Sequence, residues 1–233
     1  MHIRIAESVL ELFPELQLVV LVVRGADNES VHPEVAAVLR QEEEIARGVF
    51  GVQKLSEHPN VACWRRAYSA FGAGSDYRSS VEAITKRVIK GGQIPTINTI
   101  VDLYNLTSLK YTVPVGGEDT RLVKGDVTLM RATGTETFIA LGSQENDPPK
   151  TGEVVYVDES NEVLCRRFNW RESEKTKITP QTFDAILYIE GLPPVGEVEL
   201  KEAAYFLGEH IKKFTGAAVE SYLLKKSYPI VTI

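Results

Sequence analysis

Residues 165–177, which read "CRRFNWRESEKTK", combine basic and aromatic side chains at a spacing that could bind RNA. Guanidinium groups bind phosphates through paired N–H donors, and aromatic rings stack on bases. On an extended strand, alternate residues of this segment would face opposite sides. A solvated strand whose arginines pair with nearby glutamates is the alternative, and the pattern does not decide between them. The candidate RNA-binding residues here are Arg166, Arg167, Trp170 and Arg171.

A second basic group stands at the end of a helix that apolar spacing predicts over residues 81–90. Ser79 or Ser80 would cap the start of this helix. Cations are favoured at a helix C-terminus by the helix dipole, so the group is either an ordinary helix end or a second RNA-binding patch. Its members are Lys86, Arg87 and Lys90.

Two short segments, "VDLYNL" and "VPVGGED", place polar chemistry beside apolar runs. In the first, Asp102 and Asn105 would share one face of a helix but point opposite ways on a strand, and the pattern leaves both structures open. In the second, Gly116 and Gly117 allow positive φ and let a ligand approach the backbone. An ordinary turn is the simpler interpretation of the two glycines.

Arg131 and Glu136 stand on either side of Gly134 in the segment "MRATGTETF". They could form an ion pair across a hairpin, or they could be two residues of a pocket. An exposed ion pair would stabilise the fold by only about 0–1 kcal/mol. The spacing alone therefore assigns them no role.

Familiar catalytic and cofactor motifs are missing from the sequence. It has no HExxH or Cys-x-x-Cys spacing for a metal, no G-x-S-x-G nucleophile turn and no glycine-rich nucleotide loop. We therefore expect no metal, no cofactor and no covalent nucleophile. Cys63 and Cys165 have no partner at metal-binding spacing and are expected to be reduced thiols.

The composition is typical of a globular protein and not of a basic nucleic-acid coat protein. The 233 residues carry a net charge of -6, with 43% hydrophobic and 25% charged residues. An acidic balance still permits a local basic patch. The longest apolar run, residues 16–23, is far shorter than the ~20 residues of a membrane helix, and the first residues lack a signal-peptide pattern. We expect a cytoplasmic protein without a membrane partner.

The elements that would position these residues form a mixed α/β pattern of the α+β kind. A buried strand is predicted over residues 16–23, and short apolar segments between Gly, Asp, Asn or Pro predict antiparallel strands further on. No repeat or linker divides the chain. We predict a single domain over residues 1–233, with a core from about residue 79 to 190 and a largely antiparallel sheet flanked by helices. The predicted helices are residues 32–47, 59–71, 81–90 and 197–216.

Three segments together resemble the B3/B4 domain of the β subunit of phenylalanyl-tRNA synthetase, in its free-standing form. They are "PTINTIVDLYNLTSL", "VPVGGEDTRLVKGDVTLMRATGTETF" and "GEVVYVDESNEVLCRRFNWRESEKTKIT". The resemblance covers residues 79–190 and consists of several short motifs in one order. The matching positions are Val101, Asp102, Asn105, Pro114, Asp119, Gly125, Arg131, Ala132 and Glu136.

The resemblance implies a mixed α/β fold and an editing role. In the synthetase this domain hydrolyses tyrosine wrongly attached to the phenylalanine tRNA, with a pocket that orients a water and the ester and uses neither a nucleophile nor a metal. Tyr104 and Asn105 match the pocket wall, and Glu190 matches a glutamate that reads the amino group. Gly116 stands where the synthetase has a pocket histidine, so that contact is missing or replaced here. No part of the chain resembles an aminoacylation site.

We therefore expect an editing-type domain that binds tRNA or aminoacyl-tRNA and deacylates it. Asn105 and the backbone N–H groups of Gly116 and Gly117 would position the water and the oxyanion. The expected substrate contacts are Tyr104, Arg131, Glu136 and Glu190. The alternatives are a non-catalytic module that binds RNA or an amino acid, and a structural domain without a small ligand.

Overall fold

The computed structural model describes residues 1–51 and 54–233. Its strands are β1 (His2–Ile5), β2 (Gln17–Arg24), β3 (Val115–Asp119), β4 (Val127–Arg131), β5 (Val154–Asp158), β6 (Val163–Arg166), β7 (Arg171–Glu172), β8 (Ala185–Gly191), β9 (Ala218–Leu224) and β10 (Ile230–Thr232). Its α-helices are α1 (Glu7–Leu12), α2 (Pro33–Phe50), α3 (Pro59–Ala70), α4 (Ser80–Ile89), α5 (Thr99–Tyr111) and α6 (Glu197–Thr215), and two 3₁₀ turns cover Leu55–Glu57 and Thr120–Leu122.

The strands form two sheets where the sequence predicted one. The four-stranded sheet has the order β3-β8-β2-β9 and is antiparallel throughout. The six-stranded sheet has the order β10-β1-β4-β5-β6-β7, in which β1 and β4 form the one parallel pair. The predicted fold class, a mixed and largely antiparallel architecture flanked by helices, is confirmed.

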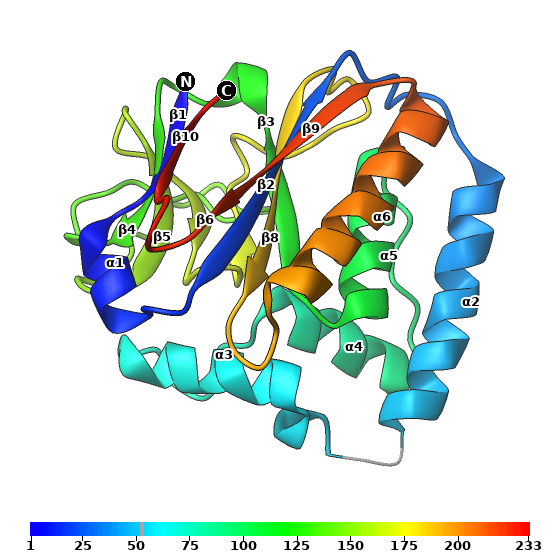
Figure 1. Ribbon diagram of the computed structural model, residues 1–233, viewed down its shortest axis with the longest axis horizontal. Helices are drawn as coiled ribbons and strands as arrows, with labels where there is room; N and C mark the ends of the chain where they lie inside the picture. The colour runs from blue at the N-terminus through cyan, green and yellow to red at the C-terminus, as the bar shows by residue number, and fades with distance from the viewer. Residues whose placement is uncertain (52–53) are drawn as a thin grey trace.

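The four-stranded sheet lies in the middle of the molecule and separates two apolar cores. Figure 1 shows α5 and α6 against one of its faces, with α2 beyond them, and the six-stranded sheet on its other side. Strand β2, which reads "QLVVLVVR", has side chains in both cores: Val19 and Leu21 pack with the helices, whereas Leu18 and Val20 face the six-stranded sheet. A strand that is covered on both faces needs this continuous apolar run.

Local capping explains why residues 99–111 form a helix, a point that periodicity left open. The Asn98 side chain accepts a hydrogen bond from the Val101 N–H at 3.0 Å, and Thr112 ends the helix with φ of 54°. Ser79 caps α4 in the same way through the Glu82 N–H, as the sequence predicted. Within the residues that the structure describes, no helix is both long and apolar enough to cross a bilayer.

Candidate functional site

A row of polar side chains interrupts the apolar face of the four-stranded sheet that is turned toward the six-stranded sheet. Side chains alternate along a strand, so Tyr188 and Glu190 on β8 share this face with the apolar Ile186. On the edge strand β3, Gly116 lies opposite Tyr188 and Glu118 lies opposite Ile186. The pairing therefore brings Glu118, Tyr188 and Glu190 to one face, beside a glycine.

The six-stranded sheet supplies a second polar row that faces the first. Tyr156 on β5 is paired with Cys165 on β6, and Cys165 is paired with Glu172 on the edge strand β7. The rings of Tyr156 and Tyr188 stack across the two sheets, with their centroids 4.7 Å apart. We call the three glutamates of these rows, Glu118, Glu172 and Glu190, the acidic cluster.

Glu190 is 2% exposed, and both of its carboxylate oxygens are hydrogen-bonded. The Tyr156 hydroxyl donates to Oε1 at 2.6 Å, and the Asn169 amide donates to Oε2. Burial raises the pKa of Glu190 to about 7, although these two donors act to lower it. Glu190 is thus a satisfied carboxyl group that titrates near neutrality.

Glu118 and Glu172 lack the partners that Glu190 has. Glu118 is fully buried, and no hydrogen bond of ordinary geometry joins a donor among the described residues to either of its carboxylate oxygens, although the nearby Thr176 hydroxyl acts to lower its pKa. Glu172 is part-exposed as a residue, but its Oε2 is buried and also without a donor. Burial raises the pKa of Glu172 to about 7. Burial, and then the neighbouring charge of Glu172, raises the pKa of Glu118 well above its ordinary value.

Three buried glutamates elsewhere in the chain do have charged partners. Glu43 pairs with Arg40 at 3.0 Å, and Glu82 accepts from Arg65 Nε at 3.0 Å. Glu153 accepts from Arg166 Nε at 2.7 Å. In contrast, among the described residues no Lys, Arg or His pairs with the acidic cluster or lowers the pKa of its members.

A hydroxyl group beside the acidic cluster is also buried without a hydrogen-bond partner among the described residues. Tyr188 is 4% exposed, and burial followed by the charges of Glu118 and Glu172 raises its pKa. Such a group costs free energy when it stays unpaired, so its place next to Glu118 and Glu172 calls for an explanation.

Tyr104 on α5 is affected by the acidic cluster. Burial raises its pKa, and so do the charges of Glu172 and Glu118. Glu118 lies on the edge strand β3 and Glu172 on the edge strand β7, and the Glu172 carboxylate approaches Gly116 of β3. Tyr104, Gly116 and Glu172 are each part-exposed, so solvent touches this place where the two sheet edges meet.

Gly116 and Gly117 lie in strand β3, so the expected turn is wrong. Neither residue has positive φ. A Cβ on Gly116 would overlap Oε1 of Glu172, and a Cβ on Gly117 would overlap Leu187 of β8. The two glycines are thus required by close approach of neighbouring groups. At Gly116, the neighbour is a carboxylate.

The backbone N–H groups of this strand are directed by its pairing with β8. The Glu190 N–H donates to the Pro114 carbonyl at 3.2 Å, so the alternation of the ladder turns the Gly116 N–H toward β8 and the Gly117 N–H outward. The Gly117 N–H lowers the pKa of Glu172 and therefore faces that carboxylate.

Arg131 and Glu136 lie outside the acidic cluster. Arg131 is exposed at the end of β4. Glu136 is 1% exposed and accepts the N–H groups of Thr133 at 2.7 Å and Gly134 at 2.9 Å, so it holds a turn. Within the described chain no ion pair joins Arg131 to Glu136, and their predicted role as substrate contacts stays a prediction.

The expectation that Arg166 and Arg167 bind RNA is wrong, because both are 2% exposed. Their guanidinium groups pair with Glu153, at 2.7 Å from Arg166 Nε and 2.9 Å from Arg167 Nη2. The strand ends at Arg166, and Arg167 and Phe168 take positive φ of 53° and 61° in a turn. The two-sided strand predicted over this segment is therefore not formed.

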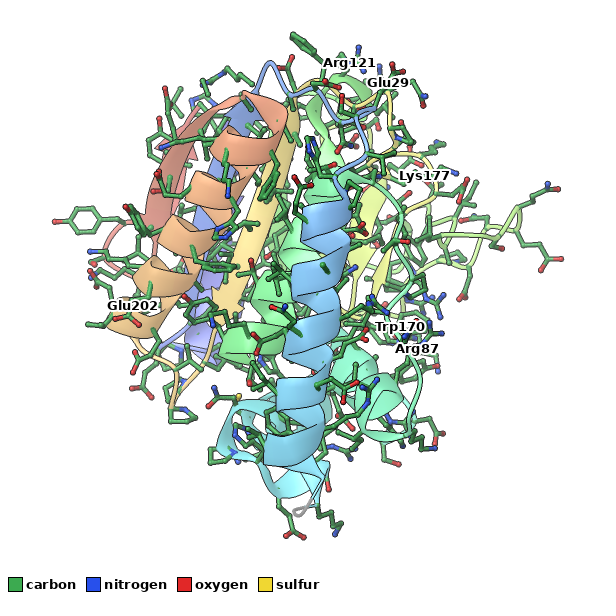
Figure 2. The ribbon with its side chains drawn as sticks, turned by 90° about the vertical axis from the view of Figure 1, so that its right-hand side faces the viewer. Glu29, Arg87, Arg121, Trp170, Lys177 and Glu202 are labelled. Atoms are coloured by element: carbon green, nitrogen blue, oxygen red, sulfur yellow. The ribbon has the colours of Figure 1, made fainter. Side chains whose placement is uncertain are left out.

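The other predicted RNA-binding residues remain accessible. Arg171 is exposed with its guanidinium 5.4 Å from the Trp170 ring centroid, and Trp170 in turn packs on Tyr77, which precedes α4. Figure 2 shows Trp170 and Arg87 on the same side of the molecule, to the right of α2. At the end of α4, Arg87 and Lys90 are exposed and Lys86 is part-exposed.

A surface cleft of about 260 Å³ lies away from the acidic cluster, between the start of α2 and residues 96–99. None of the predicted site residues lines it. Among the described residues, no three His, Cys, Asp or Glu side chains have an arrangement that could hold a metal ion. Both cysteines are free and buried.

Sequence reasoning missed Glu118, Glu172, Tyr156 and Tyr188. The alternation in "GGED" puts Gly116 and Glu118 on one side of a strand, and this was the one local signal available. This shared face can be predicted only if Gly116 and Gly117 are assigned to a strand and not to a turn. Glu172 on β7 is paired with Cys165 on β6, and no local sequence pattern predicts this pairing between the two strands.

Comparisons with known proteins agree with this fold. The family model of the B3/4 domain matches residues 63–210. A crystal structure of an N-terminal fragment of the phenylalanyl-tRNA synthetase β subunit from Pyrococcus horikoshii superposes with a TM-score of 0.51 at 14% identity. The match covers 93% of this chain and 49% of that chain, so the protein spans about half the length of the solved fragment. No curated protein sequence matches the chain.

Proposed function

The chain belongs to the B3/4 domain family, and on that basis we propose that it binds the aminoacyl end of a charged tRNA and hydrolyses the ester. One observation supports this most strongly: buried carboxyl groups without a cation lie beside part-exposed residues at the meeting of two sheet edges. An aminoacyl ester carries an α-ammonium group, and a cation with several N–H donors is the partner that such carboxylates lack.

Glu172 is the residue we assign to the α-ammonium group. The sequence pointed to Glu190, but both oxygens of Glu190 are already occupied by Tyr156 and Asn169. Glu172 is part-exposed and has one free buried oxygen, so an incoming ligand meets it first. A carboxylate that binds an ammonium group gains a charge-assisted hydrogen bond.

Hydrolysis would proceed by attack of water on the ester carbonyl. The new bond joins the water oxygen to the carbonyl carbon, the bond to the ribose oxygen breaks, and the proton from water passes to that oxygen. We assign the outward N–H of Gly117 to the developing oxyanion, once Glu172 turns from it to the ammonium group. The Gly116 N–H is directed to β8 and takes no part. The part-exposed Asn105 amide would orient the water.

The tRNA would lie along the flank that carries Trp170 and the end of α4. Its phosphates would meet Lys86, Arg87, Lys90 and Arg171, whose exposure supports such contacts. Trp170 is part-exposed and offers a ring for stacking. Arg166 and Arg167 are excluded from this role by their burial.

A panel of mischarged tRNAs tests the proposal. Purified protein is incubated with each charged tRNA, and the release of the amino acid is compared with release in buffer alone. We expect at least one ester to be released at least 100-fold faster than in buffer, and Glu172→Ala to abolish the excess. Release at the buffer rate for every amino acid would rule out hydrolysis.

A non-catalytic binding module is the second candidate, and one contact favours it. The Gly117 N–H faces Glu172, so the donor needed for an oxyanion is occupied in this state. Retained tRNA binding that weakens with added salt, without release of any amino acid, would select this alternative.

A further inference from the structure

The acidic cluster contains more unpaired carboxylate than an α-ammonium group accounts for. If Glu172 takes the α-ammonium, Glu118 still stands fully buried with both oxygens free. Glu118 lies on β3 beyond Gly116, so it is deeper than Glu172 relative to the part-exposed residues. A side chain of the bound amino acid that extends past Glu172 would meet Glu118 next.

A buried hydroxyl group points to a ligand independently of the carboxylates. The Tyr188 hydroxyl is 4% exposed and has no hydrogen-bond partner among the described residues, and the charges of Glu118 and Glu172 raise its pKa. A hydroxyl oxygen accepts hydrogen bonds from N–H donors, so this group suits a ligand rich in such donors.

The glycine at position 116 is what allows Glu172 to approach this place. Any side chain there would overlap Oε1 of Glu172 and force the carboxylate away. On strand β3, the glycine at position 116 leaves space for the Glu172 carboxylate, and Glu118 stands two residues later on the same face. These two residues together bring the carboxyl groups of Glu118 and Glu172 to one place.

We propose that the amino acid taken by this site has a cationic side chain, an ammonium or guanidinium group, that binds Glu118 while Glu172 holds the α-ammonium group. The inference rests on the proposed function, since it names the substrate class of the same site. Two cations then match two carboxylates.

The rival is a neutral side chain bound next to a protonated Glu118. Pairs of substrates that differ mainly in side-chain charge distinguish this rival from the proposal. Lysine and norleucine form one such pair, and arginine and citrulline form the other. A site with buried groups that need N–H donors rejects an analogue without them by large factors.

The test uses the full chain and one tRNA body, acylated chemically with each of the four amino acids. We expect a kcat/KM for at least one cationic ester about 100-fold above that of its neutral counterpart. Glu118→Gln is expected to reduce this preference to about tenfold or less, while Glu145→Gln, an exposed control, leaves it unchanged. Neutral esters hydrolysed within about threefold of their cationic counterparts would overturn the inference and leave the proposed function intact.

If no ester is hydrolysed, binding of the corresponding amino acid amides still tests the preference for a cationic side chain. It therefore shows whether the hydrolysis alone fails or the cation preference fails too. Calorimetry with lysinamide, norleucinamide, argininamide and citrullinamide needs no hydrolysis. Preferential binding of a cationic amide, lost in Glu118→Gln, would support the inference while hydrolysis fails. Equal binding within each pair, or no binding of any amide, would overturn it.

Discussion

Buried charge is treated in opposite ways on the two sides of the turn that joins β6 to β7. At the start of the turn, Arg166 and Arg167 are each 2% exposed, and Glu153 lies at 2.7 and 2.9 Å from them. After the turn, Glu172 meets Glu118, and neither has a cation. The same fold pairs the two arginines closely with Glu153 and leaves Glu118 and Glu172 without a cation. We interpret the first group as a structural element and the second as a site for a ligand.

Aromatic rings reinforce the paired side. The Arg167 guanidinium carbon lies 3.7 Å from the Tyr77 ring centroid and 4.5 Å from that of Trp170. Asp147 provides a further carboxylate for Arg166 at 2.7 Å. The arginine group therefore holds together the 165–170 turn, the segment before α4 and the loop before β5. In contrast, no ion pair among the described residues joins Glu118 or Glu172 to another element.

The largest effect is expected from breaking the paired side. Glu153→Gln would leave two buried guanidinium groups with half their charge uncompensated, and loss of one partner of a buried pair costs about 3–5 kcal/mol. Urea unfolding measures the change, with the exposed Glu145→Gln as control. A loss below about 1 kcal/mol would show that the arginine group is not structural.

The acidic cluster should make the stability of the protein depend on pH. Since burial raises the pKa of Glu172 and Glu190 from 4.5 to about 7, the folded state binds protons that the unfolded chain has released. The free energy of unfolding should therefore fall as the pH rises from about 4.5 to beyond about 7, by on the order of 3 kcal/mol for each group.

Glu118→Gln should weaken this fall, because it removes a carboxyl group whose pKa is held well above its ordinary value by burial and by the charge of Glu172. At pH 8 the variant is expected to be more stable than the parent by about 1–3 kcal/mol. Unfolding curves at pH 5 and pH 8 measure it, with Glu145→Gln expected to follow the parent. A variant less stable than the parent at pH 8 would mean that Glu118 has a stabilising partner in the folded state.

A smaller effect is expected at Gly116. Gly116→Ala would push Glu172 away, at a cost of about 1–2 kcal/mol for the overlap. The matched control is Gly48→Ala in α2, where a Cβ meets nothing within 4 Å and a gain of about 0.5–1 kcal/mol is expected. Combining Gly116→Ala with Glu172→Ala should cost less than the sum of the two. Strict additivity would contradict the contact.

The smallest effect on stability is expected for substitutions on the exposed basic flank. These substitutions should instead change the salt dependence of tRNA binding. Arg87→Ala and Arg171→Ala should leave unfolding within about 0.5 kcal/mol of the parent. Each should lower the slope of log affinity for tRNA against log salt by about one. An exposed lysine far from this flank, Lys201, provides the control. Unchanged slopes would place the RNA elsewhere.

The sequence carried enough information to predict most helices and the central strand. Apolar periodicity and caps such as Ser79 are local, so α4 and α6 were placed close to their observed bounds. The segment after Ile97 stayed ambiguous because α5 is buried on several sides, with Val101, Leu103 and Leu106 all covered, and an amphipathic stripe is therefore missing.

The site could be predicted only in part, for a physical reason. Glu190 and Tyr104 came from the resemblance, but Glu118 and Glu172 meet through pairing between distant strands, which leaves no local pattern. Arg166 and Arg167 looked like surface residues because charge is normally exposed. Their burial depends on Glu153, which is 13 residues from Arg166 in the sequence. It also depends on a turn in which Arg167 and Phe168 have positive φ, and no glycine in the sequence indicates that turn.

The central claim is that the unpaired carboxyl groups are kept for a cation, and the titration of glutamate side-chain carboxyl carbons by ¹³C NMR tests it most directly. In the free protein we predict that Glu172 and Glu190 titrate near pH 7, and that the titration of Glu172 is displaced in Glu118→Gln. Saturation with a dicationic amide such as lysinamide should shift the affected titrations to lower pH, while norleucinamide shifts them less. Glutamates that all titrate near their ordinary 4.5 in the free protein, or titrations that neither amide moves, would contradict the claim.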